Sequence, residues 1–135
     1  MLLWGTDESI LHDIYFNHIR FELTDSKLND VAGGNIDMRG TLYVKDGLFK
    51  SNIPGLLASD VDGLIINDFQ LQWTNPRMPW LTNGIEVDHF KNVKITNFEG
   101  TGAPNNPKAH PVELNDGENF QSDIKADEVH KTDVR

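Results

Sequence analysis

The sequence contains no cysteine, which excludes a disulfide framework, a thiolate metal site and a cysteine nucleophile. Basic residues are scarce as well: 12 Lys and Arg stand against 21 Asp and Glu, giving a formal net charge of −9. Nucleic acid is bound mainly through Lys and Arg contacts to phosphate, so this charge predicts that nucleic acid is not a partner. No apolar run reaches membrane-spanning length, and we therefore expect no membrane partner.

Helical patterning and the common active-site motifs are also missing. No stretch carries an apolar stripe at helical spacing, so we predict one all-β domain. The histidines show no zinc-site spacing, and no P-loop, dinucleotide fingerprint or Gly-X-Ser-X-Gly motif occurs, so no metal or cofactor is predicted. Residues 1–4 are too short for the apolar part of a signal peptide. The expectation is a cytoplasmic protein, or a secreted or periplasmic one if a leader and further sequence precede Met1, and the location stays unknown.

The sequence does contain a repeat, because residues 55–69 match residues 84–98 at a constant offset of 29. The matched apolar pairs are Leu56 with Ile85, Ala58 with Val87, Val61 with Phe90, Leu64 with Val93, Ile66 with Ile95 and Phe69 with Phe98. A match at an offset of 50 (Ile14 with Leu64) extends the pattern back, and one at 27 (Val93 with Phe120) extends it forward. A repeat of this period is typical of a solenoid.

Within each copy the apolar residues alternate, which is strand periodicity, and Asn, Asp and Gly lie where corners need positive φ. We therefore predict a parallel β-helix of about four to five coils, near residues 10–23, 34–50, 55–71, 84–98 and 111–124. Residues 1–124 would form this domain, residues 71–81 and 100–109 would be loops, and residues 125–135 a polar, solvated tail. Open ends expose strand edges, so we expect capping by the termini, end-to-end self-association, or further coils of a longer parent chain.

The stretches Ser59–Ile66, Thr82–Val87 and Phe90–Phe98 resemble the right-handed parallel β-helix of the pectin-degrading enzymes, most closely the polygalacturonase-like glycoside hydrolase family 28. The resemblance covers about residues 10–125. It implies a right-handed β-helix in a polysaccharide-active glycoside hydrolase, with a pectin-type glycan of galacturonate or rhamnogalacturonan as substrate.

The catalytic motifs of that family are not matched. Its Asn-Thr-Asp-Gly motif would fall on Leu81–Gly84, so Asn83 stands where the catalytic carboxylate belongs, and an amide cannot titrate. Its Asp-Asp pair would fall on Ala109–His110, and its Gly-His-Gly and Arg-Ile-Lys motifs are absent. The resemblance thus implies a fragment or a diverged member, for which a non-catalytic glycan-binding or structural segment is the alternative.

Glu86 and Glu113 are the predicted catalytic pair. Each lies at the middle of an apolar-X-apolar strand, so both would point outward from adjacent rungs about 4.8 Å apart. Like charges placed opposite each other are destabilising. A catalytic carboxyl pair for glycosidic cleavage would explain why two glutamates occupy these opposite positions. The structural alternative is two glutamate side chains that splay apart in water.

The predicted substrate-binding residues are Trp73, Arg77, Trp80, Asn83, Lys108 and His110. In the family that the chain resembles, loops entering this strand wall the substrate groove. Indole faces suit sugar rings, and Arg and Lys suit uronate carboxylates. Packing of both tryptophans, or a cation–π contact with Arg77, is the alternative. Asp60 and Asp62 lack the other oxygen ligands of a calcium loop and are predicted to be corner residues.

Overall fold

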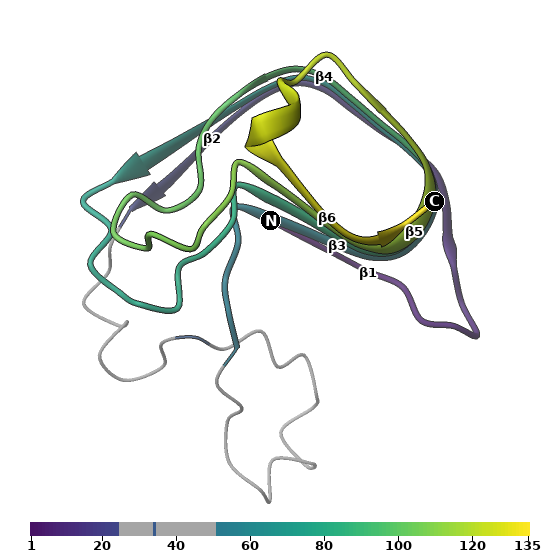
Figure 1. Ribbon diagram of the computed structural model, residues 1–135, viewed down its shortest axis with the longest axis horizontal. Coiled ribbons are helices and arrows are strands. Elements are labelled where there is room, and N and C mark those ends of the chain that lie inside the picture. Colours follow the sequence, from purple (N-terminus) through teal and green to yellow (C-terminus); the bar gives the residue numbers. More distant parts are fainter. Residues whose placement is uncertain (25–33, 35–50) are drawn as a thin grey trace, which may run out of the picture.

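The structure is a computed structural model that describes residues 1–24, 34 and 51–135. In these residues the fold is all-β, and the strands pair in parallel within one sheet of order β1-β3-β4-β5-β6, with β2 also paired to β3 (Figure 1). The elements are β1 (Leu2–Trp4), β2 (Leu11–Thr24), β3 (Leu56–Thr74), β4 (Ile85–Glu99), β5 (Val112–Ser122), the 3₁₀ helix η2 (Ala126–Glu128) and β6 (Val129–Val134). Within the described ranges, no helix is long and apolar enough to cross a membrane.

The strand register confirms the sequence repeat. Strands β3 and β4 pair at an offset of 29 residues, with Leu56 opposite Ile85 and Phe69 opposite Phe98. Strands β2 and β3 pair at the predicted offset of 50, and β4 and β5 at 27, with Ile85 opposite Val112. Residues that repeat in sequence therefore lie side by side on neighbouring strands.

The long strands bend at corners, which turn them around a shared interior (Figure 1). The corner residues have φ between 47° and 85° and lie in three register positions: Asp60, His89, Asp116 and Asp133; Asp13, Gly63, Asn92 and Asn119; His18, Asp68 and Asn97. Gly, Asn and Asp tolerate this conformation best. Corner amides also bond along the stack, because Asn119 Nδ2 donates to Asn92 Oδ1 at 2.6 Å and Asn92 Nδ2 donates to Asp62 Oδ1 at 2.7 Å.

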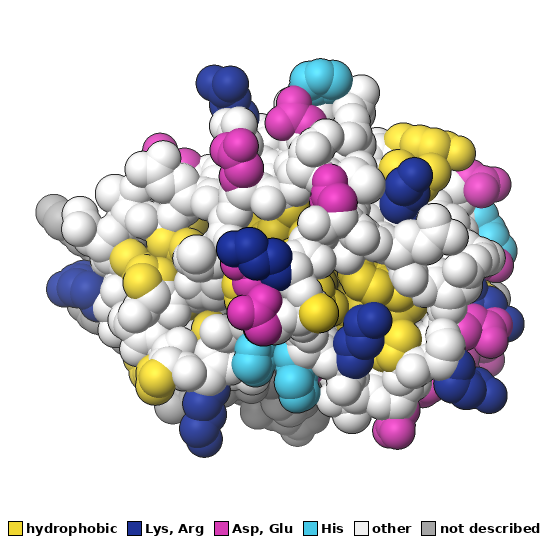
Figure 2. Space-filling model, turned by 45° about the horizontal axis from the view of Figure 1, so that its top comes forward, with side chains coloured by type: hydrophobic (Ala, Val, Ile, Leu, Met, Phe, Trp, Pro, Cys, Tyr) yellow, Lys and Arg dark blue, Asp and Glu magenta, His cyan; other side chains and the backbone are white. Residues whose placement is uncertain are grey.

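The apolar core fills the interior between the corners. Leu64, Ile66 and Phe69 of β3 are 0% exposed, as is Ile95 of β4. Side chains of β2 and β6, at the two ends of the sheet, are only partly buried against this core. Charged side chains of both signs lie interspersed on the outside, with apolar side chains between them (Figure 2).

Two predictions about segment boundaries change in the structure. Residues 71–74, predicted as loop, continue strand β3, because β2 runs alongside and Phe21 pairs with the buried Leu71. Residues 125–135 are not a solvated tail, since η2 and β6 form there and β6 pairs with β5. Val129 and Val134 pack against the core, which explains why this polar segment forms a strand. The coil predicted at 34–50 lies outside the described residues, apart from Gly34.

Candidate functional site

Two rows of side chains cross the sheet on the face opposite the core, where β3, β4 and β5 begin. We call the row formed by Leu57, Glu86, Glu113 and His130 the glutamate row. We call the row formed by Trp4, Ser59, Asp88, Asn115 and Thr132 the tryptophan row. The structure thus brings Glu86 and Glu113, the predicted catalytic pair, to directly opposite positions of adjacent strands.

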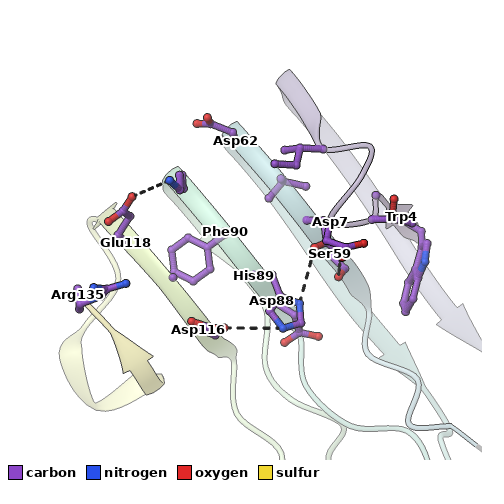
Figure 3. Close-up of a pocket in the computed structure, with 17 residues that line it drawn as sticks. Trp4, Asp7, Ser59, Asp62, Asp88, His89, Phe90, Asp116, Glu118 and Arg135 are labelled. Atoms are coloured by element: carbon purple, nitrogen blue, oxygen red, sulfur yellow. Dashed lines mark hydrogen bonds and ion pairs between the residues drawn. The ribbon is translucent and has the colours of Figure 1, made fainter.

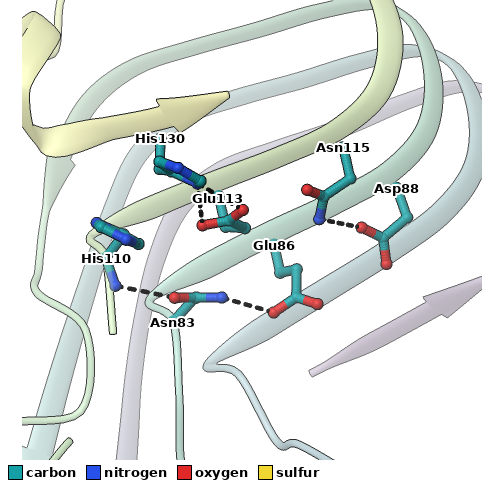
Figure 4. Close-up of polar contacts among 7 residues, drawn as sticks. All are labelled: Asn83, Glu86, Asp88, His110, Glu113, Asn115 and His130. Atoms are coloured by element: carbon teal, nitrogen blue, oxygen red, sulfur yellow. Dashed lines mark hydrogen bonds and ion pairs between the residues drawn. The ribbon is translucent and has the colours of Figure 1, made fainter. Parts of the chain in front are cut away.

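Glu86 is half-buried and held by a side chain from the preceding loop. Asn83 Nδ2 donates to Glu86 Oε2 at 2.7 Å, while Asn83 Oδ1 accepts the backbone N–H of His110 at 2.8 Å (Figure 4). Burial raises the pKa of Glu86, and the negative charges of Asp88 and Glu113 raise it further, against the lowering effect of the Asn83 hydrogen bond. Glu86 therefore favours its protonated form at a higher pH than an ordinary glutamate does.

Glu113 has a different partner. Nδ1 of His130, on strand β6, lies 2.8 Å from Oε1 and 3.0 Å from Oε2 of Glu113, and donates to the carboxylate when it carries the proton. The ring of His130 stacks on that of His110, with centroids 4.7 Å apart and planes 11° from parallel. Only 14% of the Glu113 side chain is exposed, whereas His130 is 51% exposed. The two glutamates therefore differ in environment: one accepts from an amide and the other from an imidazole.

This arrangement offers two kinds of chemistry. Two neighbouring carboxyl groups in unequal environments, one of them with a raised pKa, are the kind of pair that acid-assisted glycosidic cleavage uses. Separately, His110, Glu113 and His130 each present one atom capable of metal ligation, and these atoms lie within 4.8 Å of one another. The two imidazoles are 20 positions apart in sequence, outside the spacings that identify a zinc site in a sequence.

The tryptophan row borders a hollow of about 930 Å³, beside the corner that contains Asp60, His89 and Asp116 (Figure 3). Its lining includes Trp4, Asp88, His89, Lys91 and Arg135. Trp4 is 55% exposed, so its indole is open to solvent at the end of the row. The hollow is thus a largely apolar surface with charged side chains in its lining and the open indole of Trp4 at one end, close to the glutamate row.

Asn83 and His110, predicted from the sequence to bind substrate, lie beside the glutamate pair through the contacts given above. The other loop residues have different surroundings. Trp73 Nε1 donates to the Thr101 carbonyl at 2.8 Å, and the half-buried Trp80 ring lies against the backbone of Gly34. These contacts fit the packing role that is the alternative to sugar binding for both tryptophans. Arg77 and Lys108 are exposed on their loops.

Asp60 is a corner residue with positive φ, whereas Asp62 is not one itself and directly precedes the corner residue Gly63. Trp4 and His130 were not among the site residues predicted from the sequence. The signal for Trp4 was weak, because β1 is only three residues long. The signal for His130 was absent, since β6 pairs with β5 at an offset of 17 residues and repeats little of its pattern.

Comparisons of the chain with protein-family models, with curated proteins and with solved structures find no match. The interpretation of the site therefore rests on its geometry and on the sequence pattern.

Replacing Glu86 with glutamine is expected to stabilise the fold at neutral pH. Because the pKa of Glu86 is raised in the folded protein, Glu86 contributes most to stability when the pH is below 4.5, the ordinary pKa of glutamate. This contribution is lost as the pH rises through the raised pKa of the folded state. Glutamine keeps the shape and stays neutral, so Tm at pH 7 should rise by about 1–2 °C. Thermal unfolding followed by circular dichroism at pH 7 and at pH 4 measures the effect, which should shrink at the lower pH.

The matched control is Glu99→Gln, which makes the same change at an exposed position of the same strand. It should leave Tm unchanged at both pH values. Equal shifts in the two variants would mean that lowering the net charge, rather than relieving a buried carboxylate, causes the effect.

Proposed function

We propose that the chain is a right-handed parallel β-helix, a solenoid in which one long strand with its corners makes most of each coil. The parallel register supports this, with offsets of 29 residues between β3 and β4 and 27 between β4 and β5, as do the corner residues stacked in three register positions. In such a solenoid the outward positions of successive coils form a continuous flat face. An extended polymer fits this kind of face.

We further propose that the chain acts as a glycoside hydrolase on a pectin-type glycan, alone or as part of a longer polysaccharide-active protein. Glu86 is the general acid that protonates the leaving oxygen, and Glu113 is the carboxylate that acts from the neighbouring strand. The observation that carries this proposal is the contrast between them: Glu86 is half-buried with a raised pKa, while Glu113 faces the His130 imidazole. Such unequal environments assign acid and base roles within a carboxyl pair.

The surroundings of the pair also favour a sugar chain. The open indole of Trp4 offers an apolar platform of the kind that packs against the C–H face of a pyranose. Asp88 and Asn115, hydrogen-bonded to each other at 2.8 Å, offer polar atoms for hydroxyl groups along the same row. A glycan crossing the strands from Trp4 would pass close to the glutamate row.

Charge on this face selects among pectin-type glycans. Asp88, Glu86 and Glu113 would repel the carboxylates of a fully ionised polygalacturonate, because like charges disfavour close approach. Rhamnogalacturonan, which alternates uronate with neutral sugar, and methyl-esterified galacturonan carry fewer charges. We therefore expect both to be better substrates than polygalacturonate.

The test is reducing-sugar release by the purified chain from these three glycans, together with binding measured by affinity electrophoresis on the same polymers. Release from rhamnogalacturonan or esterified galacturonan, and slower release from polygalacturonate, is the expected result. Binding without release would exclude hydrolysis and leave a glycan-binding segment. Asn83 favours that second function, because it places an amide where the resembling family has its catalytic carboxylate.

A further inference from the structure

Three side chains that are capable of metal ligation converge at the edge of the glutamate row. His110 ends the loop before β5, Glu113 belongs to β5, and His130 belongs to β6. One ligand atom from each lies within 4.8 Å of the other two. Figure 4 shows the imidazole rings of His110 and His130 next to each other, with the Glu113 carboxylate beside them.

Hydrogen bonds and strand pairing fix the backbone from which these three side chains extend. The N–H of His110 donates to Asn83 Oδ1, and the residue is followed directly by Pro111, whose carbonyl accepts from Ile85 N. Glu113 and His130 are opposite each other in a parallel strand pair. A donor set fixed by strand register loses little conformational entropy when an ion binds, which favours binding.

From this geometry we propose that His110, Glu113 and His130 form a binding site for a divalent transition-metal ion of the zinc type. The ion takes the place of the proton between His130 Nδ1 and the Glu113 carboxylate and gains a ring nitrogen of His110 as its third ligand. Two imidazoles and one carboxylate suit Zn²⁺, Co²⁺ or Ni²⁺, whereas Mg²⁺ and Ca²⁺ prefer oxygen ligands alone. Half of the His130 side chain faces solvent, so a water molecule has room to complete the coordination.

The stacked imidazoles support a metal over a simple ion pair. A hydrogen bond between Glu113 and His130 needs only those two residues, and it gives no role to the parallel ring of His110, 4.7 Å away. A cation held by both rings and the Glu113 carboxylate uses the nitrogens of both imidazoles, whose ligand atoms lie within 4.8 Å of each other and of the carboxylate.

The test titrates the full chain, freed of metal by chelation, with zinc sulfate in a calorimeter. We expect one equivalent of zinc per chain, with an affinity at least tenfold lower in His110→Ala and in His130→Gln. The control is His18→Gln, because His18 also sits beside a carboxylate, with Nε2 3.6 Å from Asp68 Oδ2, but lies outside the cluster. Its affinity for zinc should equal that of the unaltered chain.

A second measurement guards against misfolded variants. Cobalt bound to the unaltered chain should give the visible absorption bands of a site with a low coordination number. Added zinc should displace the cobalt and remove these bands. Absence of saturable zinc binding, or binding that neither His110→Ala nor His130→Gln weakens by more than twofold, overturns the proposal. Because neither measurement uses a glycan, the metal site is tested independently of the proposed hydrolysis.

Discussion

Replacing Glu86 with glutamine is expected to lower kcat/KM for glycan cleavage by about two to four orders of magnitude, the usual contribution of a general acid. Glutamine keeps the hydrogen bond from Asn83 but has no proton to give to the leaving oxygen. Because the acid works only when protonated, the rate of the unaltered chain should fall as pH rises through the raised pKa of Glu86. The rate of the Glu86→Gln variant should not show this decrease with rising pH.

A second substrate separates the roles of the two glutamates. An aryl glycoside with an electron-withdrawing nitro group has a leaving group that departs without protonation, so Glu86→Gln should cleave it nearly as fast as the unaltered chain does. Glu113→Gln should remain slow on both substrates, because its carboxylate acts on the sugar carbon or on the attacking water. Stopped assays that follow aryl-alcohol release and reducing ends measure both rates.

Glu99→Gln again serves as the matched control, since it makes the same change at an exposed position of β4. It should leave both rates unchanged. If Glu86→Gln and Glu113→Gln hydrolyse the natural glycan as fast as the control, the proposed carboxyl pair is wrong, whatever activity the chain has.

Replacing Phe69 with alanine is expected to cost about 3–5 kcal/mol in the free energy of unfolding. The Phe69 side chain is 0% exposed, and its ring centroid lies 5.9 Å from that of Phe98 on the next strand. Ile19 flanks it in the same register on the other side, so neighbouring backbone cannot collapse into the cavity without breaking the sheet. For a domain of this size the loss is a large share of the total stability.

Urea denaturation monitored by circular dichroism measures this loss. Phe120→Ala is the comparison, because Phe120 packs against the same core from β5 but is only partly buried. Its cost should be clearly smaller. Equal costs at the two positions would contradict a core centred on β3 and β4.

Much of this architecture is readable in the sequence because the repeat is local and periodic. Strand alternation and the Asn, Asp and Gly positions predicted where the chain bends, and the offset of 29 predicted which residues pair. The same alternation predicted that Glu86 and Glu113 lie opposite each other on adjacent strands. Each of these conclusions depends only on spacing along the chain.

The sequence by itself therefore determined the all-β character, the parallel register and the position of the glutamate pair. Asn83 and His110 beside that pair were also predicted, whereas only the tertiary structure decided the positions of His130 and Trp4. Strand β6 joins the sheet at an offset of 17, with little repetition of β5, and it brings His130 to Glu113. Likewise Trp4 reaches the tryptophan row through a three-residue strand. Contacts made by such non-repeating segments depend on how much apolar surface they bury on the finished core, and spacing along the chain does not encode that quantity.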